Sequence, residues 1–566
     1  MNGEPTQSNR VERGLAAILA AGVVVVMLAA LSFKVFELDR YFVPKELVLN
    51  LAALLAGALL VLGRRPLRAD VVDALLVVFL AWSLLSAVFA GNHWLAQRAI
   101  AVSLSGAIVF WAARRAAVDG IQRMLLCAAA LATVVAASTS LAQAYGFESE
   151  WFTLARSPGG TLGNRNFIAH VVAIGLPVTL WCTIVAKRPI GALAGSLAIA
   201  ILSATLVLSR SRAAWLASAA FIAVTAIPFF ISRKYWKDTH VGGRFARALL
   251  AAFLGGTVAV VIPNTLEWKS DSPYLESARK VVDYSSGSGR GRIAQYQNSL
   301  KIVKADPIFG AGPGNWPVRY PRFAPGGDKS LADNGMTANP WPSSDWISFI
   351  SERGAVATVA LLGAFAALFF GSLRNWRELG SYDAVLLRLA LAATVVSTMV
   401  VSAFDAVLLL PAPAFLVWVI LGAAAGDRKS SRDVALSHGR AKTLTLVTVL
   451  LLVVGVFRSG ASVAAMSAVG TGGRTAGWVR AARLDPGSYR INQRLADIYA
   501  NRRQCSRARP YARRALQLFP GAPPARRTAR RCGIKLLDRN GPLYLSRTWT
   551  VMRVFPERTL SVQADR

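Results

Sequence analysis

Long apolar segments recur along this 566-residue chain, and they constrain its fold more than any other feature. A helix needs about 20 mostly apolar residues to cross the hydrocarbon core of a membrane. We predict spans at 14–33, 46–63, 71–90, 97–113, 124–145, 167–186, 190–209, 213–231, 246–263, 350–371, 384–403, 406–425 and 443–459. Only 17% of the residues are charged, against about 25% in soluble domains. The chain is therefore expected to be an all-α polytopic membrane protein with about 12–13 transmembrane helices.

Basic residues indicate how these spans are oriented, because Lys and Arg accumulate in short cytoplasmic loops. With the N-terminus inside, every predicted cytoplasmic segment carries such residues, among them Arg64 and Arg65, Arg114 and Arg115, Lys187 and Arg188, Arg374 and Arg377, and Arg428 and Lys429. The opposite short loops carry fewer. This pattern predicts a bacterial inner-membrane protein whose large loop 264–345 and whose tail after 460 are periplasmic.

The tail from 460 to 566 forms a second predicted domain beside the membrane domain 1–459. Segment 478–520 has helical periodicity, with turns at Asp485-Pro486-Gly487 and Pro520-Gly521. It resembles a tetratricopeptide-type helical hairpin of about 34 residues, and an ordinary helical hairpin fits nearly as well. Cys505 and Cys532 lie in this tail, where a periplasmic location permits a disulfide. Arg is dense there, and anionic membrane lipids or phosphorylated glycolipids are expected partners, not nucleic acid.

Charged residues at span ends are costly and often functional, and three clusters stand at the predicted outer ends. Residues 160–167 include Arg165, and residues 209–215 include Arg210 and Arg212 between two spans. The loop carries Arg290 and Arg292, followed by the glycine-rich segment 306–316. Each cluster has a simpler explanation: interfacial anchors for the first two, and solvated loop or tight turns for the third. Segment 310–314 is not expected to bind nucleotide, because it follows no strand.

Together these clusters resemble the bacterial O-antigen ligase and O-antigen polymerase superfamily. The matching stretches are 42–47, 160–167, 208–215, 291–292 with 306–316, and 345–354, so the resemblance covers roughly residues 14–425. A terminal tetratricopeptide-like extension also occurs in this superfamily. The resemblance implies a membrane glycosyltransferase that moves a glycan from a polyprenyl (undecaprenyl) diphosphate carrier to an acceptor at the periplasmic face, in O-antigen or related polysaccharide assembly.

The resemblance also implies roles for the arginines. Family arginines thought to hold the diphosphate map to Arg212 and Arg292, with Arg210, Arg165 and Arg290 as secondary candidates. Arginine binds phosphate through a planar fork without a metal. No Asp-x-Asp pair, which often holds a divalent metal in other glycosyltransferases, occurs in this chain. We therefore expect a metal-independent enzyme that uses no cofactor.

One departure from the family pattern concerns a histidine at the end of the large loop. Its position corresponds to Ser343, and loop 264–345 contains no histidine. A serine cannot take a proton near neutral pH as an imidazole can. Asp345 could accept the proton, or it could be a helix N-cap for the span entered at Trp346. His170 is a further candidate for the base, although such a histidine is more often a helix-packed polar residue. An assisted diphosphate departure could also need no strong base.

The acceptor stays open at this stage. A ligase would deliver glycan to a lipid A core, a polymerase to another carrier-linked repeat unit, and a third kind of enzyme to protein. Loop aromatics (Trp316, Tyr320, Phe323, Trp341 and Trp346) suit either sugar stacking or packing. A flippase or transporter for a lipid-linked sugar is the main alternative, but transporters place ionisable groups near the bilayer midplane, and these spans are almost free of charge. A non-catalytic family member with a scaffolding tail is the third possibility.

Overall fold

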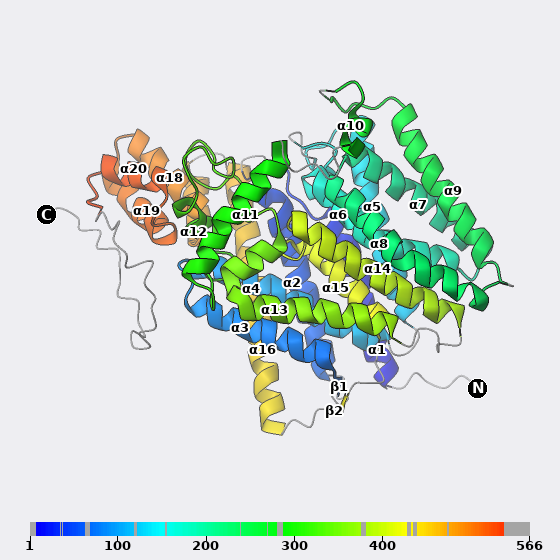
Figure 1. Ribbon diagram of the computed structural model, residues 1–566. Helices are drawn as coiled ribbons and strands as arrows, with labels where there is room; N and C mark the ends of the chain where they lie inside the picture. Colours follow the sequence, from blue (N-terminus) through cyan, green and yellow to red (C-terminus); the bar gives the residue numbers. More distant parts are fainter. Residues whose placement is uncertain are drawn as a thin grey trace. The chain divides into compact units, whose positions relative to one another are not determined.

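The computed structural model describes most of the chain as helix. The described residues are 7–33, 36, 38–62, 68–117, 121–152, 156–237, 239–268, 270–279, 287–374, 381–426, 432–433, 438–472 and 475–536. Several basic residues that support the predicted orientation lie outside these ranges, namely Arg64, Arg65, Arg377, Arg428 and Lys429. Figure 1 shows the helices in sequence colours.

Twenty α-helices are present in the described ranges. They are α1 (Gln7–Leu28), α2 (Asp39–Leu62), α3 (Val71–Val88), α4 (His93–Ala116), α5 (Gln122–Ala144), α6 (Arg165–Ile184), α7 (Pro189–Ser209), α8 (Arg212–Ile231), α9 (Val241–Val261), α10 (Pro273–Arg279), α11 (Gly287–Ala305), α12 (Trp316–Arg319), α13 (Asp345–Leu373), α14 (Tyr382–Phe404), α15 (Pro411–Ala425), α16 (His438–Gly472), α17 (Thr475–Leu484), α18 (Tyr489–Asn501), α19 (Cys505–Leu518) and α20 (Pro523–Arg531). Two-residue strands, β1 (Arg68–Ala69) and β2 (Arg432–Asp433), and the 3₁₀ turns η3 (Gly160–Leu162), η4 (Ser232–Tyr235) and η5 (Tyr320–Arg322) complete the order.

Each predicted span overlaps one helix, and 12 helices of the described ranges are long and apolar enough to cross a membrane. The polytopic all-α prediction is thus confirmed. The helix at the predicted span 406–425 is shorter than expected, because α15 begins at Pro411, and the first turn is the helix position that proline favours. All fifteen residues of α15 are buried. Helix α16 continues past 459 to Gly472, because the segment after Arg458 is rich in Ala and Val.

The chain forms two compact units. Unit 1 comprises Met1–Val78, Ala101–Asp283 and Ala360–Ser459, and unit 2 comprises Phe79–Ile100, Tyr284–Val359 and Gly460–Arg566. One of the unit boundaries falls between 459 and 460, inside α16, and the predicted division into domains 1–459 and 460–566 stays a prediction. Unit 2 nevertheless also takes in the turn between α3 and α4, the large loop and the start of α13.

Helix α6 is the central helix of unit 1. It packs against α5, α7, α8, α9, α14 and α15. Of its 18-residue apolar stretch, 83% is buried inside the protein. By contrast, only 17% of the corresponding apolar stretch is buried in α8, and the same share in α9. Side chains such as Phe230 and Phe253 are exposed on them. Because these exposed side chains are large and apolar, α8 and α9 present the face that lipid would cover.

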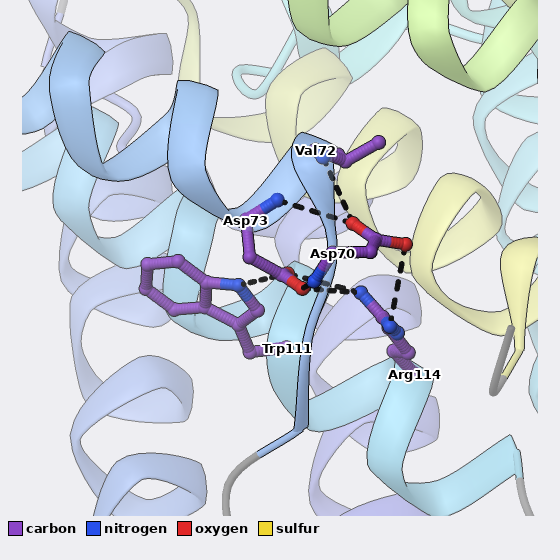
Figure 2. Close-up of polar contacts among 5 residues, drawn as sticks. All are labelled: Asp70, Val72, Asp73, Trp111 and Arg114. Atoms are coloured by element: carbon purple, nitrogen blue, oxygen red, sulfur yellow. Dashed lines mark hydrogen bonds and ion pairs between the residues drawn. The ribbon is translucent and has the colours of Figure 1, made fainter. Parts of the chain in front are cut away.

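At the predicted cytoplasmic end of unit 1, the start of α3 is pinned to the end of α4 (Figure 2). Asp70 caps α3 by accepting from the backbone N–H of Val72 at 2.8 Å. Asp73 accepts from Trp111 at 3.0 Å and from Arg114 at 2.9 Å and 3.0 Å. The Arg114 guanidinium also lies 3.5 Å from Asp70. Arg114 and Trp111 thus hold the buried Asp73 carboxylate by hydrogen bonds, and the charge of Arg114 also offsets that of Asp70.

The two short strands connect the segment before α3 with the segment before α16. β1 pairs antiparallel with β2, Arg68 facing Asp433 and Ala69 facing Arg432. Both segments were expected to be cytoplasmic, and their pairing puts them at the same end of unit 1. An alternating topology requires this arrangement.

Within unit 2, the tail docks on the turn between α3 and α4. The Asn92 side chain donates to the carbonyl of Leu518 at 3.0 Å, and the Trp94 indole donates to Asp485 at 2.8 Å. Asp485 also accepts from Ser462, near the end of α16, at 2.8 Å. The tail is therefore held by directed hydrogen bonds as well as by apolar packing.

The tail helices α18, α19 and α20 pack around a core of small residues, with Ala496, Ala512, Ala515, Ala525 and Ala529 buried. The predicted turns at 485–487 and 520–521 lie between helices, as expected. The tetratricopeptide assignment itself stays a prediction. Cys505 and Cys532 form a disulfide that ties the start of α19 to the residue after α20.

Candidate functional site

The segment 160–167 is a buried turn that positions Arg165 at the start of α6. Lys45, fully buried on α2, donates to the carbonyl of Thr161 at 2.8 Å and also to that of Ala29. The Thr161 hydroxyl donates to Met27 at 2.7 Å. Asn164 caps α6 by accepting from the N–H of Asn166 at 3.0 Å. These bonds bring α1, α2 and α6 together at the predicted outer end, so Arg165 starts from a rigid backbone.

Arg210 and Ser211 form the two-residue turn between α7 and α8. Arg210 adopts a left-handed backbone conformation with φ 52°. Many α-helices end at a residue in this conformation, and α7 ends here. Ser211 is buried, and Arg212 is the first residue of α8. A turn this short places Arg210 and Arg212 at the same end of unit 1 as Arg165, and all three side chains are half-buried.

Trp268 joins two of these arginines. The guanidinium carbon of Arg165 lies 4.9 Å from the centre of its ring, and that of Arg210 lies 4.6 Å away. Two like charges on one indole repel each other, but each gains a cation–π interaction. The indole Nε1 of Trp268 is buried and has no hydrogen-bond partner within the described part of the chain.

Arg210 has additional partners on α10. Its Nε donates to the Ser277 hydroxyl at 2.8 Å, and its Nη2 lies 3.7 Å from a carboxylate oxygen of Glu276. Burial lowers the pKa of Arg210, and the nearby Glu276 acts in the opposite direction. Arginine stays charged despite such shifts, so the Glu276 carboxylate faces a charged Arg210.

His170 lies on α6, one turn beyond Arg165. It is 1% exposed, and its ring centre is 6.5 Å from that of Phe167. This burial matches the simpler alternative of a helix-packed polar residue. Its suggested role as a base stays a prediction.

In unit 2, α11 carries Arg290 and Arg292, with Arg290 exposed and Arg292 half-buried. Arg292 precedes Gln295 and Tyr296 by three and four residues, so the three share one helix face. The Gln295 side chain accepts from the N–H of Ser343 at 2.7 Å, and the Tyr296 hydroxyl donates to the carbonyl of Ser343 at 2.5 Å. Arg292 therefore stands on the face of α11 that holds Ser343, the residue at the family histidine position.

Asp345 follows on this segment as the first residue of α13 and is fully buried. Ser344 rather than Asp345 caps the helix, since its hydroxyl accepts from the N–H of Ile347 at 3.4 Å. The expectation of Asp345 as the N-cap is therefore wrong by one residue, because α13 starts at Asp345 itself. Helix caps depend on the backbone conformation of one residue, which the sequence pattern does not determine to that accuracy.

Glu352 and Arg353 are a second polar pair on α13. Glu352 accepts from the N–H groups of Gly314 at 2.8 Å and Trp316 at 2.9 Å. Arg353 is fully buried, and its Nη1 donates to the Ser83 hydroxyl at 3.0 Å. Its guanidinium carbon lies 5.0 Å from the ring centres of Phe79 and Phe349. These contacts fasten the glycine-rich segment and the end of α3 to α13.

The glycine-rich segment 306–316 is a series of tight turns against α13. Gly310, Gly312 and Gly314 have positive φ. The N–H groups of Ala311 and Gly312 donate to carbonyls of α13 at 2.9 Å and 2.8 Å. These N–H groups therefore hold the segment against α13.

The loop aromatics named from sequence separate into two kinds. Trp316 and Tyr320 are fully buried, with ring centres 4.4 Å apart, and the Trp316 indole donates to Ser299 at 2.9 Å. Phe323, Trp341 and Trp346 are half-buried. The first two therefore form the core of the loop, and only the others have surface on which a sugar could stack.

Among the described residues, no three His, Cys, Asp or Glu side chains gather as a metal site would require. Arg165 and Arg210 are brought together in unit 1, where Arg212 shares their end of the bundle. Arg292, Ser343 and Asp345 gather in unit 2. The structure thus presents an arginine–tryptophan group in one unit and a loop group in the other.

Comparison with known families bears on both groups. Residues 197–362 match a family model described as O-antigen ligase. The matched region includes Arg210 and Arg212 as well as Arg290, Arg292, Ser343 and Asp345, whereas Arg165 and His170 precede it. The match supports a relationship of this region to the O-antigen ligase and polymerase superfamily. No curated protein matches the chain.

Sequence reasoning missed several residues of this matched region. Trp268 is one, because a lone tryptophan in a loop gives no sign of its neighbours. Gln295 and Glu352 are others, since their partners lie 48 and 36–38 residues away in sequence. Lys45 precedes the region and stood in a stretch quoted for the family resemblance. A lysine between two predicted spans could have been singled out as a costly charge.

Proposed function

We propose that this protein is a membrane glycosyltransferase that transfers a glycan from a polyprenyl diphosphate carrier, in assembly of O-antigen or a related surface polysaccharide. The observation that carries the proposal is the stacking of Arg165 and Arg210 on Trp268. The shared indole holds two guanidinium groups at one end of unit 1, and the planar fork of arginine suits phosphate oxygens. The family match over 197–362 supports the same reaction class.

In the proposed reaction, an acceptor hydroxyl oxygen bonds to the anomeric carbon while the bond from that carbon to the carrier's diphosphate breaks. The diphosphate leaves with the electron pair and gains negative charge. Stabilising such charge is usually the largest catalytic contribution. Arg212 and Arg292 are the proposed principal diphosphate ligands, and Arg165, Arg210 and Arg290 assist them. No metal or cofactor takes part in the proposal.

The acceptor proton requires a base. Asp345 is the proposed base, because it lies two residues after Ser343 on the segment that α11 holds in place. His170 is the second candidate. Asp345→Asn or His170→Ala should then reduce transfer, whereas Ser343→Ala should change it little.

The experiment that tests this function replaces the arginines and the tryptophan in the intact organism. Arg212→Ala and Arg292→Ala should each abolish the polymer while protein abundance stays normal. Trp268→Ala should lower polymer by about tenfold or more, the loss of one charge-assisted contact, and Trp268→Phe should retain much of it by stacking. Trp151→Ala is the matched control, since Trp151 is 46% exposed. Normal polymer in the Arg212 and Arg292 variants would refute the diphosphate role.

A gel of cell-envelope lipopolysaccharide from a deletion strain separates the two enzyme types. Lipid A core that carries no ladder of repeat units indicates that a ligase was lost. Core that carries one repeat unit indicates that a polymerase was lost. An unchanged gel directs attention to another polymer or to protein glycosylation. Turnover of the purified enzyme should survive EDTA, and sensitivity to the chelator would contradict the metal-free proposal.

We also propose an inner-membrane location with the large loop and the tail periplasmic. The paired strands β1 and β2, which put two predicted cytoplasmic segments at one end of unit 1, support the alternation of the spans. An impermeant thiol reagent should label single cysteines placed at exposed Arg290 or Arg494 in intact spheroplasts, and it should not label one placed at exposed Arg247. The reverse pattern would overturn the orientation.

A further inference from the structure

Six exposed arginines gather at one end of the tail. Arg502 and Arg503 follow α18, Arg507 and Arg509 lie in the first two turns of α19, and Arg530 and Arg531 end α20. We call these six residues the arginine end.

Contacts between the helices hold the arginine end together. The Arg531 side chain donates to Asn501 at the end of α18 at 2.7 Å. Arg509 Nε donates to the carbonyl of Cys532 at 3.0 Å, and Cys532 is joined to Cys505 by the disulfide. The helix ends that carry the six arginines are therefore held together in one small region.

This region has no counter-charge of its own. Between 475 and 531 the sequence holds fourteen arginines, no lysine and two acids, Asp485 and Asp497. Asp485 binds Trp94 and Ser462, and Asp497 accepts from Gln493 and Thr528. Within the described part of the chain, none of the six arginines forms an ion pair.

Helix stability accounts for only some of these charges. Cations favour helix C-termini, which suits Arg502 and Arg503 after α18 and Arg530 and Arg531 on α20. Arg507 lies in the first turn of α19, where a cation is unfavourable, and that turn contains no acidic residue. Gathered like charges repel, so this arrangement costs stability unless an anion binds there.

We propose that the arginine end binds a glycolipid whose sugars carry phosphate groups, and that it holds this glycolipid as the acceptor. Arginine in place of lysine fits this ligand, because its planar fork contacts two phosphate oxygens at once. The opposite end of α19, at Leu518, is the one docked on Asn92. A helix of 14 residues puts the arginine end about 20 Å along the helix from that contact. The choice of an acceptor glycolipid rests on the proposed function.

The test uses the purified full-length protein in nanodiscs of zwitterionic lipid. The probe is a fluorescent rough lipopolysaccharide core with its phosphates intact, and the same core after enzymatic dephosphorylation. One variant combines Arg502→Gln, Arg503→Gln, Arg507→Gln and Arg530→Gln, four residues whose side chains make no hydrogen bond within the described part of the chain. The control combines Arg480→Gln, Arg483→Gln, Arg490→Gln and Arg494→Gln, an equal loss of charge on exposed residues of α17 and α18.

The first variant should bind the phosphorylated core at least about tenfold more weakly than wild type does. The control variant should bind it nearly as wild type does. The dephosphorylated core should bind weakly to wild type and to both variants. Equal weakening in both variants, or none in the first, would overturn the proposal. Equal weakening of binding to phosphatidylglycerol vesicles would assign the surface to the bilayer instead. Arg212→Ala should bind the core normally while losing transfer, so failure of this binding and failure of the glycosyltransferase are separately visible.

Discussion

The side-chain carbonyl of Gln295 accepts the backbone N–H of Ser343 at 2.7 Å, and its amide donates to the Ser330 hydroxyl at 3.0 Å. Gln295 is 5% exposed on α11. Ser330 pairs through its carbonyl with Ala338, next to Met336, which packs on the tail core. One glutamine therefore connects the helix of Arg292, the segment resting on the tail, and the position of the missing histidine.

Gln295→Ala should lower transfer and leave Arg292 chemically intact. Gln295→Glu keeps the acceptor for Ser343 and should restore part of the activity, which a purely space-filling role would not predict. The measurement is polymer per unit of membrane-inserted protein, with exposed Gln297→Ala as the matched control. Equal activity in wild type and Gln295→Ala would contradict the positioning role.

Glu352→Ala should destabilise the protein more than most substitutions do. It leaves the N–H groups of Gly314 and Trp316 buried without an acceptor, at about 1–3 kcal/mol each. Thermal unfolding in detergent and protein abundance are the measurements. Exposed Glu267→Ala is the control, and an unfolding midpoint equal to wild type in Glu352→Ala would show that the glycine-rich segment does not depend on it.

The loop should lose stability in acid through Asp328. Burial acts to raise the pKa of Asp328, but hydrogen bonds from Ser330, Tyr320 and Asn298 together bring it below its ordinary value. A depressed folded pKa contributes stability above about pH 3.9, the ordinary value for Asp, and this contribution is lost as pH falls through the folded pKa. Protease resistance of the loop should fall in that range, and Asp328→Asn should flatten this dependence.

The loop should also lose stability at alkaline pH, through Tyr320. Burial is the main cause that raises its pKa to about 12. A raised folded pKa contributes stability below about pH 10, the ordinary value, and this is lost as pH rises toward 12. Tyrosinate absorbance at alkaline pH should therefore include a late phase, and Tyr320→Phe should reduce that phase by one tyrosine.

The Cys505–Cys532 disulfide should be detectable by counting thiols. In denaturant, a maleimide should modify two cysteines, Cys127 and Cys182, before reduction and all four after it. A sequence separation of 27 corresponds to about 3.5 kcal/mol of chain-entropy stabilisation. Cys505→Ser with Cys532→Ser should accordingly make the tail more sensitive to protease, and four free thiols in the unreduced protein would contradict the bond.

Local pattern alone was enough to predict the long apolar helices of this protein, but not α10, α11 and α12 of the large loop. Apolar runs of span length predict every long apolar helix. A helix in lipid must form its backbone hydrogen bonds internally and present apolar side chains to the lipid. The ends were less accurate: Pro411 shortened α15, Ser344 moved the start of α13, and Ala-rich sequence extended α16. Arg165 and Arg210 were singled out from sequence, since charges at span ends are costly enough to stand out, and their functional role stays a prediction.

The tertiary structure alone decided which of these residues meet. Trp268 between Arg165 and Arg210, Gln295 between Ser330 and Ser343, and Glu352 beneath Gly314 all join residues distant in sequence, and no local period encodes such contacts. The same holds for the tail, whose arginines are a run of charges in sequence and become one end of a folded body when helix packing and the disulfide bring them together. The sequence by itself determined the membrane class, the helices and the candidate charges, because burial and chain geometry act locally. The pairing of those charges followed from packing, which depends on the whole chain.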